Sequence, residues 1–409
     1  MKIFGEHEES TLAQLRDVAS RAERAALMAD GHLGYVMPIG GVAAYRERVS
    51  VVGVGFDIAC GNAAIRTDLT LADFGADARD VGLRLNQLAD QIQGEVSFGI
   101  GRKNLSGDAP VDDPLFEDVA WEAVPGHHER DRLRAKAREQ LGTVGSGNHY
   151  VDVFADETGA IWVGVHFGSR GFGHTVASGF LALSQGAPWG ARAPEAEVLL
   201  PLAQPLGHDY WQLMQLAGRY AYAGREWVAR KVVDILGGRE LELVHNHHNF
   251  AWRETHGGEE LIVVRKGATP AFPGQKGFIG GSMGDDAVIV QGTPSQDADD
   301  ETRAVQEDAL FSTVHGAGRV MSRTAAAGKR NRRTGAVIRP GLITTDMMES
   351  WVRQKGVVLR GGGLDESPHV YRRLPDVLAA QGSTVEVLHT LRPLIVVMAG
   401  ANEFDPYRD

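Results

Sequence analysis

The sequence has a single cysteine, Cys60, among 409 residues. One thiol excludes an intramolecular disulfide and is typical of proteins in a reducing compartment. No apolar run approaches the length of a membrane span. The N-terminal stretch MKIFGEHEESTLAQL is too charged for the core of a signal peptide. We therefore expect a cytoplasmic protein that has no membrane partner.

An excess of positive charge is also lacking. The 42 Lys and Arg residues are outnumbered by 53 Asp and Glu residues, which gives a net charge of -11. This balance argues against a protein that coats nucleic acid in general, but it leaves room for a local basic groove. The sequence shows no internal repeat, no low-complexity segment and no change of composition that marks a linker. The chain is long enough for one large domain or for two or three average ones, and its composition gives no sign of a domain boundary.

Glycine, in contrast, is abundant. The chain has 51 glycines, about 12% of its residues against a usual ~7%. They are spread along the whole chain and are not gathered in one linker. This distribution indicates many tight turns and sites built from loops.

The segment STVHGAGRVMSR, residues 312–323, carries the strongest chemical signal. It sets His315 before Gly316 and Gly318, and it continues with Arg319 and Arg323. Glycines let backbone N–H groups approach an anion closely, and arginines match phosphate oxygens. A histidine in this setting can attack phosphorus or pass a proton to a group that does. Taken alone, the same pattern is more often a glycine turn with a surface histidine.

Periodicity predicts the secondary structure. Helices are expected over residues 9–28, 80–93, 130–141 and 206–236, where apolar residues recur at helical spacing. Strands are expected over residues 51–61, 150–153, 161–165, 240–244, 260–264, 287–290 and 388–398. The segment MADGHLG after the first helix carries Asp30 and His32, and such a polar pair beside glycines is usually a simple turn. We interpret RKGA, residues 265–268, as a basic turn.

Several of these strands end in side chains that bind metals. The strand at 51–61 ends in Asp57 and Cys60, and histidines lie at the ends of three others. If these ends converge, the ligands are Asp57, Cys60, His149, His166 and one of the histidines at 245–248. Five ligands exceed a tetrahedral set, which favours two ions that share Cys60. The alternative is a buried structural cysteine with satisfied core histidines.

Taken in order, these segments resemble the RtcB family of RNA-splicing ligases. The resemblance rests on MADGHLG, GVGFDIACG, GTVGSGNHYVD, HFGSRG, HNHHNFA, RKGA, GGSMG and HGAGRVMSR, and it covers nearly the whole chain. HGAGRVMSR and DIACG are its most specific parts. The resemblance implies a single large α+β domain over residues 1–409, with mixed sheets and a metal centre at converging strand ends. It also implies a GTP- and manganese-dependent ligase that joins RNA 3′-phosphate or 2′,3′-cyclic phosphate ends to 5′-hydroxyl ends.

The resemblance further implies a role for each matching residue. His315 would attack the α-phosphorus of GTP and carry GMP as a phosphoramidate. Two Mn²⁺ ions would be held by Asp57, Cys60, His149, His166 and His248. The guanylate would contact Asn148, His149, Tyr150, Val151, Asp152, His248, Asn249, Gly280, Gly281, Ser282, Met283, His315, Gly316, Ala317 and Gly318. RNA phosphates would meet Arg170, Arg265, Lys266, Arg319 and Arg323.

Three positions depart from the family pattern. The C-terminal lysine-glycine that reaches the guanine is replaced by Met398-Ala-Gly400, a serine after GSMG is Ala287, and a glutamate is Asp152. A lysine ammonium donates to guanine O6, so its absence predicts poor discrimination between GTP and ATP. A substitute donor would be Arg392 or a residue of the extension at 401–409.

Two other functions fit the same residues. One is a metal-dependent phosphatase or cyclic phosphodiesterase that acts on RNA ends without nucleotide transfer. The other is a non-catalytic protein that binds RNA ends. Covalent labelling by GTP separates the ligase from both, and RNA-end processing without GTP separates these two from each other.

Overall fold

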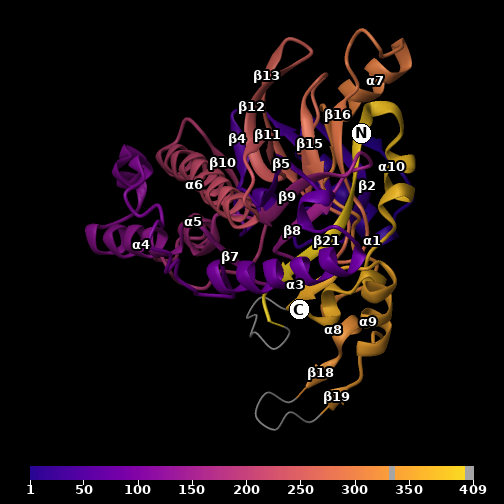
Figure 1. The fold of residues 1–409 in the computed structure, drawn as a ribbon. Coiled ribbons are helices and arrows are strands. Elements are labelled where there is room, and N and C mark those ends of the chain that lie inside the picture. Colours follow the sequence, from indigo (N-terminus) through magenta and orange to yellow (C-terminus); the bar gives the residue numbers. More distant parts are fainter. Residues whose placement is uncertain (331–336, 401–409) are drawn as a thin grey trace.

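The computed structural model describes residues 1–330 and 337–400. Its helices are α1 (Glu9–Ala19), α2 (Val51–Val54), α3 (Ala78–Glu95), α4 (His127–Gln140), α5 (Arg170–Ser184), α6 (Pro205–Leu236), α7 (Asp300–Asp308), α8 (Arg323–Ala327), α9 (Thr345–Gln354) and α10 (Leu374–Gln381). Helices α4, α5 and α6 lie together on one side of the sheets, and α8 and α9 lie together at another end (Figure 1). No helix in the described ranges is long and apolar enough to cross a membrane.

The largest sheet carries most of the candidate site. Its strand order is β11 (Glu240–His247), β5 (Gly61–Thr70), β9 (Ala160–Phe167), β8 (Tyr150–Ala155), β21 (Val385–Met398), β16 (Ala287–Gly292) and β15 (Lys276–Ile279), with β20 (Val358–Arg360) parallel to β21. The two end strands of this path meet, because the Asn246 side-chain amide on β11 donates to the Lys276 carbonyl on β15 at 3.2 Å. The sheet therefore curves almost into a barrel.

A second sheet has five strands. Its order is β1 (Lys2–Ile3), β2 (Arg24–His32), β3 (Ile39–Tyr45), β13 (Glu259–Lys266) and β12 (Asn249–His256). Four short pairs complete the described strands: β10 (Leu199–Pro201) with β4 (Arg48–Ser50), β14 (Ala268–Pro270) with β17 (Ser312–Val314), β18 (Lys329–Arg330) with β19 (Val337–Arg339), and β6 (Ser97–Phe98) with β7 (Thr143–Gly145). The predicted α+β class, with mixed sheets in one domain, is confirmed.

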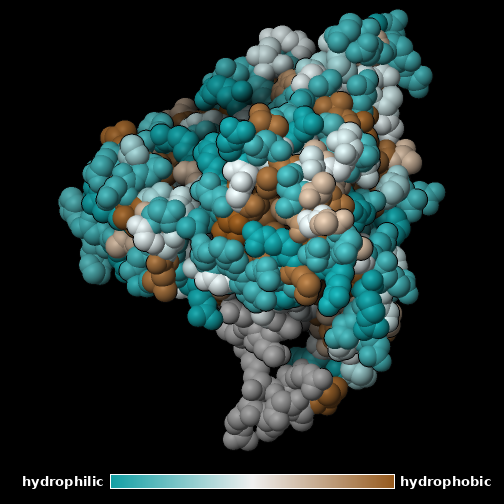
Figure 2. Space-filling model, in the orientation of Figure 1, coloured by the Kyte–Doolittle hydropathy of each residue, from teal (hydrophilic) through white to brown (hydrophobic). Residues whose placement is uncertain are grey.

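The core has two main parts. One is formed by α2, α5 and α6 against the five-stranded sheet, around Phe172, Tyr210 and Val264. The other lies between the large sheet and the helices α3 and α6, around Leu88, Val163 and Val232. Figure 2 shows a mostly hydrophilic surface, with apolar residues gathered over the middle of the large sheet. Both cores border the strand ends that carry the candidate site and hold them in place.

Two predictions of secondary structure are wrong. The helix expected over residues 9–28 ends at Ala19, and residues 24–32 form β2 in the middle of the five-stranded sheet. Leu27 and Met28 are fully buried there, so burial on both faces overrides the helix propensity of an alanine-rich segment. The strand expected over 51–61 is the helix α2 followed by a turn, because the Ser50 hydroxyl accepts the Gly53 N–H at 2.8 Å and caps a helix.

The other predicted helices and strands are confirmed with small changes at their ends. One further correction concerns RKGA: Arg265 and Lys266 close the strand β13 and are not in a turn. The sequence of β13 shows no alternation of polar and apolar residues, because this strand is buried along most of its length.

Candidate metal centre and nucleotide pocket

A pocket of about 280 Å³ opens where the ends of these strands meet. It brings together residues that are far apart in the sequence, from His32 at the end of β2 to Met398 at the end of β21. Of the residues predicted from the sequence, it is lined by Asp57, Cys60, Asn148, Tyr150, Asp152, His166, His248, Asn249, Gly280, Gly281, Ser282, Met283, His315, Gly316, Ala317, Gly318 and Arg319. The convergence expected from the sequence is therefore present in the fold.

The predicted metal ligands form one group. The Cys60 Sγ lies 3.5 Å from Nε2 of His166 and 3.7 Å from Nε2 of His149. The Asp57 carboxylate lies 3.1 Å from the same nitrogen of His149. The His248 ring stacks 5.1 Å from that of His166, and its backbone N–H donates to the Cys60 carbonyl at 2.8 Å.

Both of the histidines nearest to Cys60 are held by their other nitrogen. Nδ1 of His149 donates to the Val144 carbonyl at 2.9 Å. Nδ1 of His166 lies 2.5 Å from the Asn62 Oδ1, and the Asn62 amide nitrogen donates to the Phe278 carbonyl, which fixes the amide with its oxygen toward His166. These contacts orient both rings so that Nε2 is directed at the thiol, as outer hydrogen bonds do in known metal sites, and Nε2 of His149 also meets the Asp57 carboxylate.

Burial sets the charges of this group. It lowers the pKa of His166 and His248 well below 6.5, so both rings are neutral. Burial alone would raise the pKa of Asp57, but the hydrogen bond from His149 and the charges of His149 and Arg170 lower it to about 2. Burial raises the pKa of the Cys60 thiol well above 9.0. The thiol of Cys60 and the imidazoles of His149 and His166 offer ligand atoms within 4.8 Å of one another, and this donor set fits a divalent metal ion.

The guanidinium of Arg225, on α6, lies directly behind this group. Arg225 is fully buried, and its Nη1 donates to the carbonyls of Ala59 at 2.8 Å and Phe167 at 2.6 Å. Its Nη2 lies 2.7 Å from Nδ1 of His247, and its Nε donates to Nε2 of His245 at 2.9 Å. One side chain thereby ties together three separate segments of the chain.

Each of these segments carries a predicted metal ligand next to the bonded residue: Ala59 precedes Cys60, Phe167 follows His166, and His247 precedes His248. Burial lowers the pKa of Arg225 to about 10, so it remains charged at neutral pH. A fixed positive charge at this place favours a thiolate and neutral imidazoles, the forms that bind a metal.

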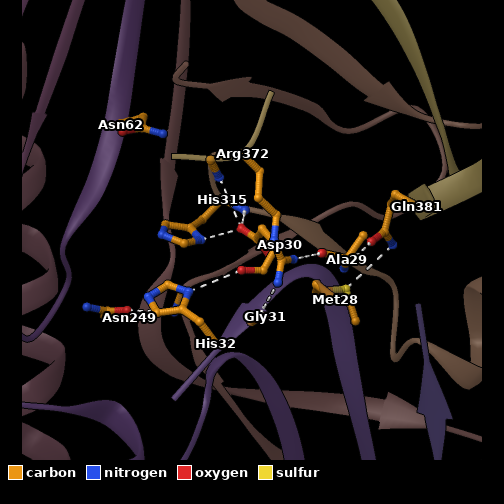
Figure 3. Close-up of polar contacts among 12 residues, drawn as sticks. Met28, Ala29, Asp30, Gly31, His32, Asn62, Asn249, His315, Arg372 and Gln381 are labelled. Carbon is orange, nitrogen blue, oxygen red and sulfur yellow. Dashed lines mark hydrogen bonds and ion pairs between the residues drawn. The ribbon is translucent and has the colours of Figure 1, made fainter. Parts of the chain in front are cut away.

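His315 lies on the other side of His248, with ring centroids 4.9 Å apart. Its Nδ1 is 2.6 Å from Oδ2 of Asp30, and the same oxygen accepts the backbone N–H groups of His315 at 3.0 Å and Gly316 at 3.3 Å. Figure 3 shows the imidazole directed at this carboxylate, and the His32 ring directed at the backbone carbonyl of the same Asp30, at 3.1 Å. The contact holds the proton on Nδ1 and leaves Nε2 as the nucleophilic atom.

The segment that carries Asp30 is itself fixed from two sides. Arg372 donates to the carbonyls of Ala29 at 2.5 Å and Gly31 at 3.1 Å (Figure 3). The close approach requires glycine at position 318, with φ of 74°, because a Cβ there would lie 2.3 Å from the Asp30 carbonyl. The sequence around Asp30 indicates only a simple turn, so this partner of His315 is a site residue that the sequence reasoning missed.

The strand β8 divides the predicted nucleotide residues by its alternation. Tyr150 and Asp152 face the pocket, and the Tyr150 hydroxyl and Asp152 Oδ1 are buried without a hydrogen-bond partner among the described residues. Val151 points the other way, into the core beside Val165 and Val397, so its side chain does not line the pocket. Burial raises the pKa of Asp152 well above 3.8.

The three departures fall at different depths. Ala287 is buried in an apolar cluster and does not line the pocket, whereas Met398 does. Ala399 is buried, and its carbonyl accepts the Gly362 N–H at 2.9 Å. No lysine lines the pocket within the described ranges, and Arg392 is exposed outside it. The extension at 401–409 lies outside the residues that the structure describes.

Four of the five arginines and lysines predicted to meet RNA phosphates already have partners. Arg265 is fully buried, with Nη1 2.6 Å from a Glu254 carboxylate oxygen. Lys266 is 4% exposed, and its Nζ donates to the Val52 carbonyl at 3.0 Å. Both side chains are structural, so the predicted RNA contacts of these two residues are wrong.

Arg319 and Arg323 are paired with acidic residues beside the pocket. Arg319 lies 3.4 Å from a Glu366 oxygen, and Arg323 contacts Asp365 at 3.1 Å and also Glu366. Their charges are largely offset there. The fifth cation, Arg170, differs: its Nη1 lies 3.1 Å from Nδ1 of His149, and it forms no ion pair with a described residue.

Several pocket residues carry no sequence signal of their own. They are Ile39, Asn62, Phe154, Asp285, Glu366, Tyr371 and Val396, whereas His32, Gly267 and Met398 also line the pocket and belong to segments that the sequence singled out. Asn62 follows Cys60 by two residues, so a search for polar side chains facing the same side of β5 would have found it. Glu366 and Tyr371 lie in segments without a periodic pattern, and only the fold brings them to the site.

Comparison with known proteins gives a consistent result. The model of the family described as tRNA-splicing ligase RtcB matches residues 11–399. The RNA-splicing ligase RtcB of Escherichia coli is 32% identical over 400 residues, which cover 91% of this chain and 89% of that protein. The tRNA-splicing ligase RtcB of Archaeoglobus fulgidus is 31% identical over 443 residues, which cover 90% of this chain and 86% of that protein.

Proposed function

This chain belongs to the RtcB family, and we propose that it is an RNA ligase that works through a guanylylated His315. Its substrates are RNA 3′-phosphate or 2′,3′-cyclic phosphate ends and 5′-hydroxyl ends. The observation that carries the proposal is the orientation of His315: Asp30 holds Nδ1 at 2.6 Å, and the ring lies one histidine away from the metal-ligand group. A cytoplasmic location remains our expectation from the sequence.

The first step is the transfer of GMP to His315. Nε2 forms a bond to the α-phosphorus of GTP, the bond from that phosphorus to the bridging oxygen of pyrophosphate breaks, and pyrophosphate leaves. The ring then carries charge, which the Asp30 carboxylate stabilises at Nδ1. The chain's own residues contribute the orientation of the nucleophile and the glycine-lined approach to the phosphates.

The residues that would hold two Mn²⁺ ions are Asp57, Cys60, His149, His166 and His248. When bound, such ions neutralise phosphate charge and help the leaving pyrophosphate. Cys60 Sγ lies 3.7 Å and 3.5 Å from Nε2 of two other ligands, His149 and His166, and is the candidate for a shared position. Elemental analysis of Cys60→Ala tests this: loss of both ions supports a shared ligand, and unchanged metal content excludes it.

The second step consumes the GMP. An RNA 3′-phosphate is a poor electrophile, and transfer of GMP from His315 to one of its oxygens activates it. The 5′-hydroxyl then attacks the phosphorus of the RNA 3′-phosphate. A phosphodiester bond forms, the bond from this phosphorus to the oxygen shared with GMP breaks, and GMP leaves. A 2′,3′-cyclic phosphate end must first be opened by water to the 3′-phosphate.

In the pocket, the base of the nucleotide would meet Tyr150 and Asp152. Both have buried polar atoms without a partner among the described residues, and an incoming base with N–H groups would satisfy them. The lysine of the family pattern is absent, so these two side chains would provide the base contacts.

The proposal is tested with two RNA oligonucleotides, one with a 3′-phosphate and one with a 5′-hydroxyl. Joining should require GTP and Mn²⁺ and should be lost in His315→Ala, with metal content unchanged. His369→Ala is the matched control, because His369 does not line the pocket. Joining by His315→Ala at the normal rate would exclude the covalent mechanism. Removal of the end phosphate without joining or GTP would favour the phosphatase.

A further inference from the structure

The pairing of the expected phosphate-binding residues leaves the RNA strand without an assigned path. Arg265, Lys266, Arg319 and Arg323 are held by other protein groups. Cations without carboxylate partners near the metal-ligand group lie instead on the side of α4 and α5. Arg170, at the start of α5, is one of them.

Lys136, on α4, is the second. Its side chain packs against Gly171, where a Cβ would lie 2.6 Å from Nζ. Lys136 forms no ion pair in the part of the chain that the structure describes. The arginines around it on the same helix all do: Arg130 with Glu122, Arg132 with Glu129, Arg134 with Asp131 and Arg138 with Glu117. The unpaired amine thus lies beside the first turn of α5, which carries Arg170.

Aromatic rings lie on the same side. Phe56 directly precedes the predicted ligand Asp57 and is only half-buried. Its ring lies 6.5 Å from Tyr35 in an edge-on contact and 5.7 Å from His174 in a tilted one. Tyr35 is 57% exposed. Half-exposed aromatic rings next to a charged site are more typical of a stacking surface than of a core.

The cations and the rings form one continuous surface. His174 lies on α5, one turn after Arg170, and its pKa is lowered by burial and by the nearby charge of Lys136, while Asp57 acts in the opposite direction. Gly171, against which Lys136 packs, lies three residues before His174 on α5, and the His174 ring contacts that of Phe56 beside Asp57, so His174 is close to both Lys136 and the metal-ligand group. Lys266 Nζ lies 5.7 Å from the centre of the Tyr35 ring and forms a cation–π contact with it.

We propose that single-stranded RNA reaches the metal centre across this RNA approach surface, formed by Tyr35, Phe56, Lys136 and His174. Bases stack on the rings, and Lys136 meets a backbone phosphate. Stacking on rings accepts any base, so the surface selects single strands and not a sequence. The inference rests on the proposed function, since it supplies the RNA substrate of the same site.

The experiment separates RNA binding from guanylylation, because labelling of His315 by GTP needs no RNA. The probe is a single-stranded RNA with a 3′-phosphate, and its affinity is measured at several salt concentrations. Lys136→Ala should lower the slope of log affinity against log salt by about 0.7, the value for one phosphate contact on a single strand. Tyr35→Ala should weaken binding about tenfold or more with the slope unchanged.

Arg134→Ala is the matched control, because this half-exposed arginine of α4 is paired with Asp131 at 3.3 Å. It should leave both the affinity and the slope as they are. Both test variants should keep wild-type labelling by GTP. Unchanged RNA affinity in Lys136→Ala and Tyr35→Ala, or lost labelling in both, would overturn the inference. Absent labelling in the wild-type protein, with the RNA effects present, would count against the proposed ligase alone.

Discussion

Replacing Asp30 by asparagine tests how His315 is prepared as a nucleophile. Oδ2 of Asp30 accepts from Nδ1 of His315 and from the N–H groups of His315 and Gly316. The amide in Asp30→Asn keeps the shape of the side chain but loses the charge that stabilises the ring as it becomes positive. We expect slower guanylylation, with the apparent KM for GTP and the metal content unchanged.

The size of the effect follows from the contact that is lost. A hydrogen bond to a charged group is worth about 1.5–3 kcal/mol. Each 1.36 kcal/mol of barrier changes a rate tenfold, so Asp30→Asn should label roughly 10- to 150-fold more slowly. A neutral amide oxygen can still accept one of the backbone N–H groups, which keeps the loop in place.

The assay is single-turnover labelling with α-labelled GTP. Because Asp30 is fully buried, the denaturation midpoint of each variant is measured as well, and rates are compared for folded protein only. Asp68→Asn is the control, since Asp68 pairs with the exposed Arg239 at 2.8 Å on the surface. A labelling rate within twofold of wild type in folded Asp30→Asn would refute the role given to this carboxylate.

Three further changes are predicted. Arg225→Met should lower metal affinity, because it removes the hydrogen bonds that hold the backbone beside three predicted ligands. Titration with Co²⁺ should then show a weaker thiolate absorption band. The control Arg230→Met, on the exposed face of the same helix, should leave this band unchanged. The native protein should be labelled by ATP and by GTP at rates within about tenfold of each other. Ala399→Lys should raise the preference for GTP by one to two orders of magnitude, about 1.5–3 kcal/mol. Strong selectivity of the native protein for GTP, unchanged by the lysine, would show that another group reads the base. Burial lowers the pKa of His32 and His245 to about 4, so the unfolded chain binds protons below pH 6.5 that the folded chain does not. The free energy of unfolding should therefore fall between pH 6.5 and 4, by on the order of 2 kcal/mol per histidine at pH 5, and His245→Gln should remove part of this loss.

The sequence predicted the chemically reactive residues of the site better than the residues that hold them in position. Cys60, His166 and His315 stand out because each lies within two residues of a glycine at the end of an apolar run, and the structure brings them to one pocket. Asp30 did not stand out, because its partner His315 is 285 residues away. A carboxylate that acts through such a distant contact leaves no local pattern.

Most of the wrong predictions share a physical cause. Residues 24–32 and the residues Arg265 and Lys266 lie in strands buried on both faces, where neither alternation nor charge indicates which side a residue faces. Charge alone suggested phosphate contacts for Arg265, but its partner Glu254 is visible only in the fold. The near-barrel closure of the large sheet likewise depends on pairing between distant strands, which periodicity does not encode.

The central claim is that His315 carries the nucleotide. Incubation with α-labelled GTP and Mn²⁺, followed by digestion and mass spectrometry, locates the label on one residue. The account predicts GMP on His315 through a bond that acid cleaves and base does not, and no label in His315→Ala. Label on a lysine, or no label on protein that is folded, loaded with metal and active in joining RNA, would contradict it.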